Sequence, residues 1–327
     1  MHAALPVWFE IGSMVILTLI LIADVLIIFK RPHIPSAKES TAWVAFYALL
    51  AIAFGGVIAW LGNAEAASQF YAGWLTEYSL SVDNLFVFVI IMSRFSVPKK
   101  YQQEVLMVGV VMALVLRGLF IIAGAALIQT FSAIFYIFGA FLIYTAYHQA
   151  FRTEDDDEES ESKLIVMLRK RITVAKDFDG AKIRTVVDGK KVFTPMIVVF
   201  TAIALTDVMF AFDSIPAIFG ITTDAFIVFT ANVFALMGLR QLYFLLGGLL
   251  DKLEYLKYGI AFILGFIGFK LIAHAMHENE LPFINGGHHI DWAPEISTNT
   301  SLIVIVASIS IAAIASAVKI KLSAKSQ

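Results

Sequence analysis

Two short stretches of this chain combine carboxylates with small polar side chains inside otherwise apolar sequence. The first, E-Y-S-L-S-V-D-N, runs from Glu77 to Asn84, and the second, D-V-M-F-A-F-D-S, runs from Asp207 to Ser214. Each has an acid, five intervening residues, a second acid and a small polar residue. Ionisable groups are costly inside apolar helices and commonly mark a functional site.

The side chains of both stretches offer oxygen ligands for a cation. They carry carboxylates, hydroxyls and a carboxamide, with no centrally placed histidine, and the chain contains no cysteine. Oxygen-rich sites suit Mn²⁺, Mg²⁺ or Ca²⁺ better than Cu⁺ or a structural Zn²⁺. We therefore predict a metal site built from Glu77, Asp83, Asn84, Asp207, Asp213 and Ser214.

The six-residue spacing of the acids limits how one helix can present them. At ~3.6 residues per turn, Asp83 lies about 120° around the helix from Glu77, and Asp213 lies equally far from Asp207. Two acids of one stretch therefore cannot face one ion equally well in a regular helix. Either the helix is distorted, for which Pro216 gives a reason, or the two acids have different partners.

Arg117 and Arg240 are the predicted partners of some of these acids. Each lies in an apolar helix that follows one acidic stretch, and such an arginine pairs inside the bundle when it can. Four carboxylates and two guanidiniums leave a charge of −2, which one divalent cation or protons could compensate. The alternative is a set of buried ion pairs that only fixes how the helices pack.

Membrane helices must position these residues. The chain has 327 residues, of which 59% are hydrophobic, and a soluble protein of this size could not hide so much apolar surface. A span needs roughly 20 apolar residues. We predict an all-α polytopic membrane protein with about nine transmembrane helices, near 10–29, 42–62, 72–93, 105–128, 133–150, 194–219, 226–249, 256–274 and 301–320.

Loop charges and an internal repeat set the predicted topology. Lysine and arginine gather in alternate loops, which places the N-terminus outside and the C-terminus in the cytoplasm. Each acidic helix is followed by an arginine-bearing helix and a third apolar helix. Because three is odd, two such units enter the membrane from opposite sides and form inverted repeats, a common construction in secondary transporters.

The predicted divisions of the chain follow from this topology. They are two N-terminal helices with the first outer loop at 1–71, one repeat at 72–150, a cytoplasmic insert at 151–193, the second repeat at 194–274, a histidine-bearing outer loop at 275–299, and a C-terminal helix with a basic tail at 300–327.

Two of these segments allow more than one interpretation. The insert begins with an acidic run, continues with a basic amphipathic segment, and should end in a β-hairpin that turns at Asp188-Gly189. Its role could be regulatory, or it could be a linker. The 275–299 loop carries histidine and acidic residues, which could gather metal ions or form an ordinary polar loop.

Several longer motifs resemble the TerC family of integral membrane proteins, first associated with tellurium resistance. They include E-Y-S-L-S-V-D-N-L-F-V-F, V-L-R-G, A-L-T-D-V-M-F-A-F-D-S-I-P-A-I-F and L-K-Y-G-I-A-F-I-L, and the likeness covers roughly 70–275. The resemblance implies a bacterial inner-membrane location and metal-ion export, chiefly of Mn²⁺. It also implies that the acids of both stretches, Glu77, Asp83, Asp207 and Asp213, are important for this function. The 275–299 loop is outside the pattern.

The expected function is therefore export of a divalent cation with Mn²⁺ as the transported substrate, no tightly bound cofactor, and protons as candidate counter-ions. The alternative is a non-transporting scaffold or sensor in a metal or tellurite stress-resistance complex. An enzyme with an aspartate acid–base pair is disfavoured, because the chain has no G-x-G-D, H-E-x-x-H, G-x-S-x-G or Walker motif. No feature of the sequence predicts binding to nucleic acid or a particular oligomeric state.

Overall fold

The structure is a computed structural model that describes residues 5–30, 36–130, 133–151, 175, 177–187, 190–246, 255–279, 281, 284–290 and 292–325. Its helices are α1 (Val7–Lys30), α2 (Ala37–Leu61), α3 (Ala64–Arg94), α4 (Lys99–Thr130), α5 (Ile134–Phe151), α7 (Met196–Phe219), α8 (Ala225–Leu236), α9 (Leu239–Leu246), α10 (Leu256–His277), η2 (Asn285–Gly287) and α11 (Thr298–Lys325). Two strands, β1 (Arg184–Val187) and β2 (Lys190–Phe193), complete the described elements.

The chain is an all-α polytopic membrane protein, as predicted. Within the described ranges, eight helical spans are long and apolar enough to cross a membrane, and α1 adds a shorter apolar stretch, Val7–Ala23. Many large apolar side chains point outward, among them Trp60, Ile122 and Ile303. Exposed apolar surface of this extent is expected where lipid, and not water, surrounds the helices.

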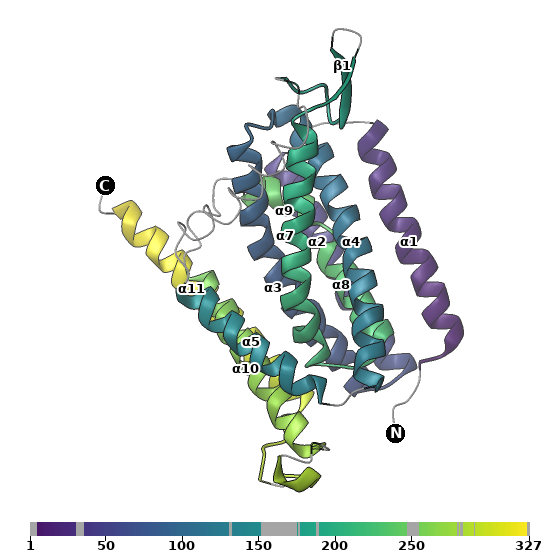
Figure 1. Cartoon of the computed structure of the whole chain (residues 1–327), viewed down its shortest axis with the longest axis vertical. Coiled ribbons are helices and arrows are strands. Elements are labelled where there is room, and N and C mark those ends of the chain that lie inside the picture. The colour runs from purple at the N-terminus through teal and green to yellow at the C-terminus, as the bar shows by residue number, and fades with distance from the viewer. Residues whose placement is uncertain are drawn as a thin grey trace.

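The helices form two groups (Figure 1). The upright group contains α1, α2, α3, α4, α7, α8 and α9, and the second group, α5, α10 and α11, lies together at an angle to it. The hairpin lies at one end of the upright group. The start of α1 lies at the opposite end of this group, and the loop that contains η2 lies on the same side of the molecule, beyond the end of α10.

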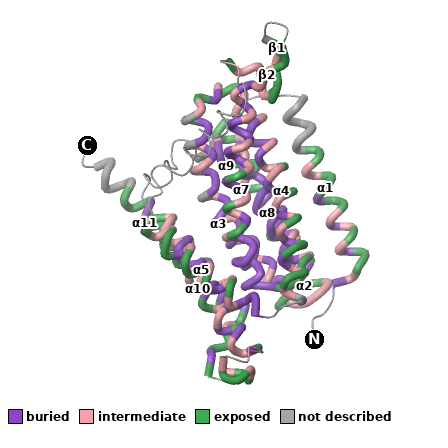
Figure 2. The backbone as a smooth tube through the Cα atoms, in the orientation of Figure 1, coloured by how far each residue is buried: buried purple, intermediate pink, exposed green. Residues whose placement is uncertain are grey.

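Helix α3 lies at the centre of the packing and carries the first acidic stretch. It contacts α2, α7, α8 and α11, and much of its length is buried (Figure 2). It begins at Ala64, earlier than the predicted span at 72, because the Asn63 side chain caps it by accepting a hydrogen bond from the Ala66 amide at 2.7 Å.

The predicted span at 226–249 is two helices and not one. Helix α8 ends at Leu236 and α9 begins at Leu239. Gly238, between them, has a φ of +83°, a conformation that glycine adopts without the steric cost that a side chain brings. A β-carbon there would also lie 3.1 Å from the Tyr47 ring. The break separates Arg240 from the helix that holds the centre of this span.

The described part of the insert contains the predicted hairpin. Strands β1 and β2 are antiparallel, and their register pairs Val187 with Lys190, on either side of the predicted turn. Asp188 and Gly189 themselves lie outside the described residues. The acidic run and the basic segment of the insert lie within 152–174, outside the described residues.

Helices α5 and α10 approach each other closely at two glycines. A β-carbon on Gly139 would lie 2.7 Å from the Gly268 carbonyl oxygen, and one on Gly268 would lie 2.8 Å from the Gly139 carbonyl oxygen. Such contacts let the two backbones touch, which is how membrane helices gain packing energy without a hydrophobic driving force.

We expect Gly268→Ala to lower the thermal unfolding midpoint of the detergent-purified protein, because the new methyl group meets backbone that cannot move aside. Overpacking of this kind costs about 1–3 kcal/mol. The matched control is Gly56→Ala on α2, where a β-carbon meets no atom within 4 Å. Equal midpoints for the two variants would contradict the close contact between α5 and α10.

Candidate functional site

An arginine on α4 connects three helices in the middle of the upright group. Arg117 is 1% exposed, and its Nη1 donates hydrogen bonds to Glu77 Oε2 on α3 and, at 3.0 Å, to Asn232 Oδ1 on α8. The carboxamide of Asn84 faces its oxygen toward Arg117 Nη2 at 3.1 Å, while its nitrogen donates to the Leu80 carbonyl at 2.9 Å. Asn232 in turn donates to the Val228 carbonyl.

The predicted pairing of Arg117 with a motif acid is therefore present in the structure. Glu77 is 0% exposed, so the pair lies entirely inside the protein. Breaking a buried ion pair by removing one partner is strongly destabilising. Glu77 acts here as a partner of Arg117, and Asn84 uses its oxygen in the same way.

Helix α7 directs its two acids to different partners. Asp207 is buried and lies close enough to interact electrostatically with both Arg117 and Glu77. Its Oδ2 atom has no hydrogen-bond partner among the described residues. Asp213, in contrast, accepts a hydrogen bond from Thr145 Oγ1 on α5 at 3.0 Å. Acids six residues apart on one helix require either a distorted helix or different partners. Asp207 and Asp213 have different partners and lie on one α-helix.

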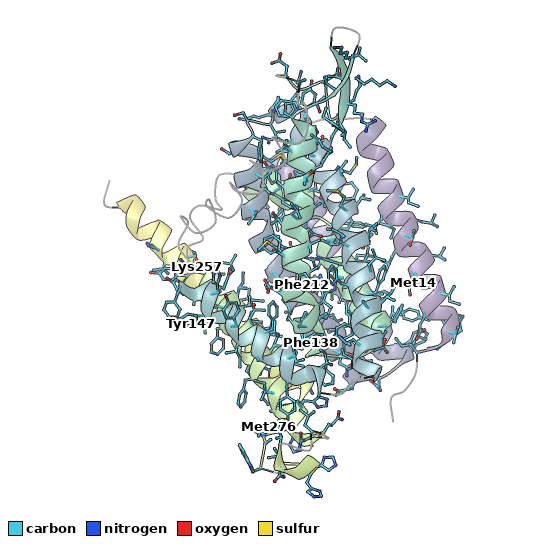
Figure 3. All side chains as sticks on the ribbon, viewed as in Figure 1. Met14, Phe138, Tyr147, Phe212, Lys257 and Met276 are labelled. Atoms are coloured by element: carbon cyan, nitrogen blue, oxygen red, sulfur yellow. The ribbon has the colours of Figure 1, made fainter. Side chains whose placement is uncertain are left out.

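A small cavity lies beside Asp213 where the two groups of helices meet. Its volume is about 20 Å³, which is room for about one water molecule or one ion. Four helices line it with two residues each: Leu80 and Asn84 on α3, Thr145 and Gln149 on α5, Phe210 and Asp213 on α7, and Ile260 and Leu264 on α10. The cavity thus joins two residues from each acidic stretch, of which Asn84 and Asp213 are polar. Phe212, next to Asp213 and labelled in Figure 3, points outward and lies against Phe120.

The structure divides the six predicted ligands between several positions. Asn84 and Asp213 line the cavity, whereas Glu77 and Asp207 belong to the surroundings of Arg117. Ser214 is buried and its hydroxyl has no partner within the described ranges. The side chain of Asp83 lies outside the description.

Arg240 lies on α9, beyond the break at Gly238. Its pairing with an acid of the second stretch stays a prediction.

Three functional candidates were missed by sequence reasoning. Asn232 was not among the predicted site residues, but it contacts Arg117. Thr145 and Gln149 lie on α5, which has no acidic motif. The available signal was their spacing of four residues, because it places two polar side chains on one face of an apolar helix.

Two of the three histidines of the outer loop, His277 and His289, have ring contacts within the loop. A ring nitrogen of His277 contacts the Ala293 carbonyl, and one of His289 contacts the His277 carbonyl. His274 lies 3.4 Å from a Glu278 carboxylate oxygen. Across the described residues of the chain, no group of three or more histidine, cysteine or acidic residues is arranged to hold a metal ion. These contacts favour a structural polar loop.

A family profile described as "Integral membrane protein TerC family" matches residues 62–321. The chain belongs to the TerC family. The match includes all four acidic positions and both arginines. It is longer than the region 70–275 that contains the motifs resembling the family. No solved structure matches the chain.

Membrane proteins of several bacteria are similar to most of the chain. An uncharacterised membrane protein of Mycobacterium bovis is 44% identical over 299 residues, covering 89% of this chain and 75% of the relative. An uncharacterised membrane protein of Myxococcus xanthus is 40% identical over 260 residues, covering 80% and 82%. A protein of Escherichia coli K12 named "Putative membrane-bound redox modulator Alx" is 40% identical over 270 residues, covering 80% and 84%.

Proposed function

We propose that this TerC protein exports a divalent metal cation, with Mn²⁺ as the principal substrate, across the bacterial inner membrane. The observation that carries the proposal is the cavity beside Asp213, because it lies among membrane-spanning helices and is lined by residues of both acidic stretches. A carboxylate with neutral oxygen donors is the ligand type that Mn²⁺ prefers.

The inverted repeat is part of this proposal and is supported by the helix pairings. Helix α3 packs on α8, α4 packs on α7, and α5 packs on α10. In a repeat, α3 would correspond to α7, α4 to α8 with α9, and α5 to α10. Exchanging the members of each pair turns the contact of α3 with α8 into that of α7 with α4, and it leaves the contact of α5 with α10 unchanged. A twofold relation between the repeats requires this. In transporters built this way, the substrate site lies at the interface of the repeats near the middle of the bilayer.

The proposed orientation has the N-terminus outside and the C-terminus in the cytoplasm. It is supported by the lysines and arginines of alternate loops. The same orientation places the hairpin on the cytoplasmic side and the loop containing η2 on the outer side.

Protons are the proposed counter-ions. Asp207, which is buried with one oxygen unpartnered among the described residues, is the candidate group to carry one.

Flux measured with the purified protein in liposomes tests the proposal. Mn²⁺ loaded on the cytoplasmic side should appear on the other side faster than in protein-free liposomes, and a pH gradient across the membrane should change its rate. Ca²⁺, Mg²⁺ and Zn²⁺ measured in parallel define the preference. Binding of Mn²⁺ without flux would instead support the non-transporting sensor or scaffold.

A further inference from the structure

We propose that helix α5 supplies two oxygen ligands for the transported cation, the hydroxyl of Thr145 and the side-chain carbonyl of Gln149. The assignment rests on the proposed function and adds to it residues that lie outside both acidic stretches. Three features of the cavity lead to it: its size, the orientation of Asn84, and the face that α5 presents.

The cavity is too small for a hydrated ion. Its volume of about 20 Å³ holds about one water-sized particle, whereas Mn²⁺ in water is surrounded by an octahedral shell of oxygen ligands. An ion that occupies the cavity must therefore exchange most of its water ligands for oxygen atoms of the protein. The walls of the cavity have to provide those atoms.

Asn84 is poorly oriented to provide one. Its carboxamide oxygen faces Arg117 Nη2 at 3.1 Å, and its nitrogen donates to the Leu80 carbonyl. A cation at this side chain would compete with the guanidinium for the oxygen. Of the other polar residues that line the cavity, Asp213 supplies the negative charge, and Thr145 and Gln149 carry a hydroxyl oxygen and a carboxamide oxygen.

Helix α5 presents these two side chains together. Thr145 and Gln149 are four residues apart and so share one face of the helix. The Thr145 hydroxyl donates a hydrogen bond to Asp213 Oδ1 at 3.0 Å, which fixes the position of the carboxylate and leaves the lone pairs of the hydroxyl oxygen for a cation. The remaining walls, Leu80, Phe210, Ile260 and Leu264, are apolar and would limit access of water to the ion.

The chemistry of the two donors predicts a selectivity. Hydroxyl and carboxamide oxygens suit Mn²⁺, Mg²⁺ and Ca²⁺, whereas imidazole nitrogen suits Zn²⁺ and Ni²⁺. Replacing Gln149 by histidine should therefore shift the preference from Mn²⁺ toward Zn²⁺. Replacing it by leucine should weaken binding of every cation, because a ligand is lost and none is gained.

The test measures Mn²⁺ binding to the purified full-length protein, by loss of the electron paramagnetic resonance signal of free Mn²⁺, together with flux in liposomes. Thr145→Val and Gln149→Leu should each weaken Mn²⁺ binding by roughly 10-fold or more. Gln149→His should show weaker Mn²⁺ binding and stronger competition by Zn²⁺. Gln149→Glu keeps oxygen atoms that can bind the cation and should retain Mn²⁺ binding. It is the control for a general loss of folding when this position is changed.

Two control variants match these changes away from the cavity. Tyr147→His places an imidazole on the same helix at a side chain that is 66% exposed and labelled in Figure 3. Thr201→Val removes a hydroxyl on α7 that donates only to the Ile197 carbonyl of its own helix. Both controls should bind Mn²⁺ as the wild-type protein does.

The outcomes separate this inference from the proposed function. If the wild-type protein binds and transports Mn²⁺ and the α5 variants match it, the ligand assignment is wrong and the transporter stands. If the wild-type protein neither binds nor transports Mn²⁺, both are wrong. Weaker binding in the α5 variants, with normal controls and a Zn²⁺ shift in Gln149→His, supports the assignment.

Discussion

We expect Asp213→Asn to abolish Mn²⁺ efflux while leaving the protein folded and in the membrane. Asp213 is the carboxylate that lines the cavity between the two groups of helices. The substitution keeps the shape of the side chain and an oxygen that can accept the hydrogen bond from Thr145, but it removes the negative charge. A neutral cavity cannot compensate a divalent cation that has left its water behind.

The expected loss is about 100-fold in apparent affinity for Mn²⁺, which corresponds to about 2.8 kcal/mol. Flux in liposomes at several Mn²⁺ concentrations measures the change in apparent affinity, and efflux from Mn²⁺-loaded cells measures the loss of transport. Glu295→Gln makes the same chemical change at an exposed position of the outer loop and should transport normally. Asp83→Asn should behave like Asp213→Asn if the two acidic stretches have equivalent roles. Wild-type efflux by both aspartate variants would rule out the proposed site.

The second large effect concerns stability. We expect Arg117→Met to lower the free energy of unfolding by about 3–5 kcal/mol, because it leaves Glu77 charged, buried and without its guanidinium partner. Asn84 and Asn232 would also lose the donor to which their oxygens are directed. Thermal unfolding of the detergent-purified protein measures the change. Lys99→Met removes an exposed cation from the first turn of the same helix and should change the midpoint little.

A double substitution separates the buried charge from the lost packing. In Glu77→Gln combined with Arg117→Met, the carboxylate that pairs directly with Arg117 is removed together with it, while Asp207 keeps its charge and loses the nearby guanidinium. Replacing a buried ion pair by neutral groups is often close to neutral in stability. The double variant should therefore recover most of the stability that the single variant loses. A double variant as unstable as Arg117→Met would show that the packing around Arg117, and not the charge on Glu77, is what matters.

The sequence predicted the features that depend on composition and helical period. The spans follow from the length of their apolar stretches. The spacing of Asp207 and Asp213 allowed either a distorted helix or different partners. The cost of an unpaired charge in an apolar environment predicted that Arg117 pairs with one of the motif acids, and the structure shows that this acid is Glu77. The hairpin followed from the turn residues of the insert. Each of these arguments uses only local sequence and a general energetic cost.

Features that depend on how helices meet were not predictable in the same way. Gly238 breaks one predicted span, but a glycine in an apolar helix is as commonly a close contact as a break. Thr145 and Gln149 lie on α5, and no local pattern shows that their face of the helix meets Asp213. The role of Asn84 changed for the same reason, since its oxygen is directed by Arg117 on another helix.

The contact between Gly139 and Gly268 has a mechanical consequence. Because the backbones of α5 and α10 touch there, neither helix can slide past the other without a clash, and the two must shift as one rigid body. The cavity has half of its walls on this pair, Thr145, Gln149, Ile260 and Leu264, and the other half on α3 and α7. The cavity therefore lies between the pair α5 and α10 and the pair α3 and α7. If the cavity holds the transported ion as proposed, a movement that parts α5 and α10 from α3 and α7 opens it and carries the hydroxyl of Thr145 away from the carboxylate of Asp213.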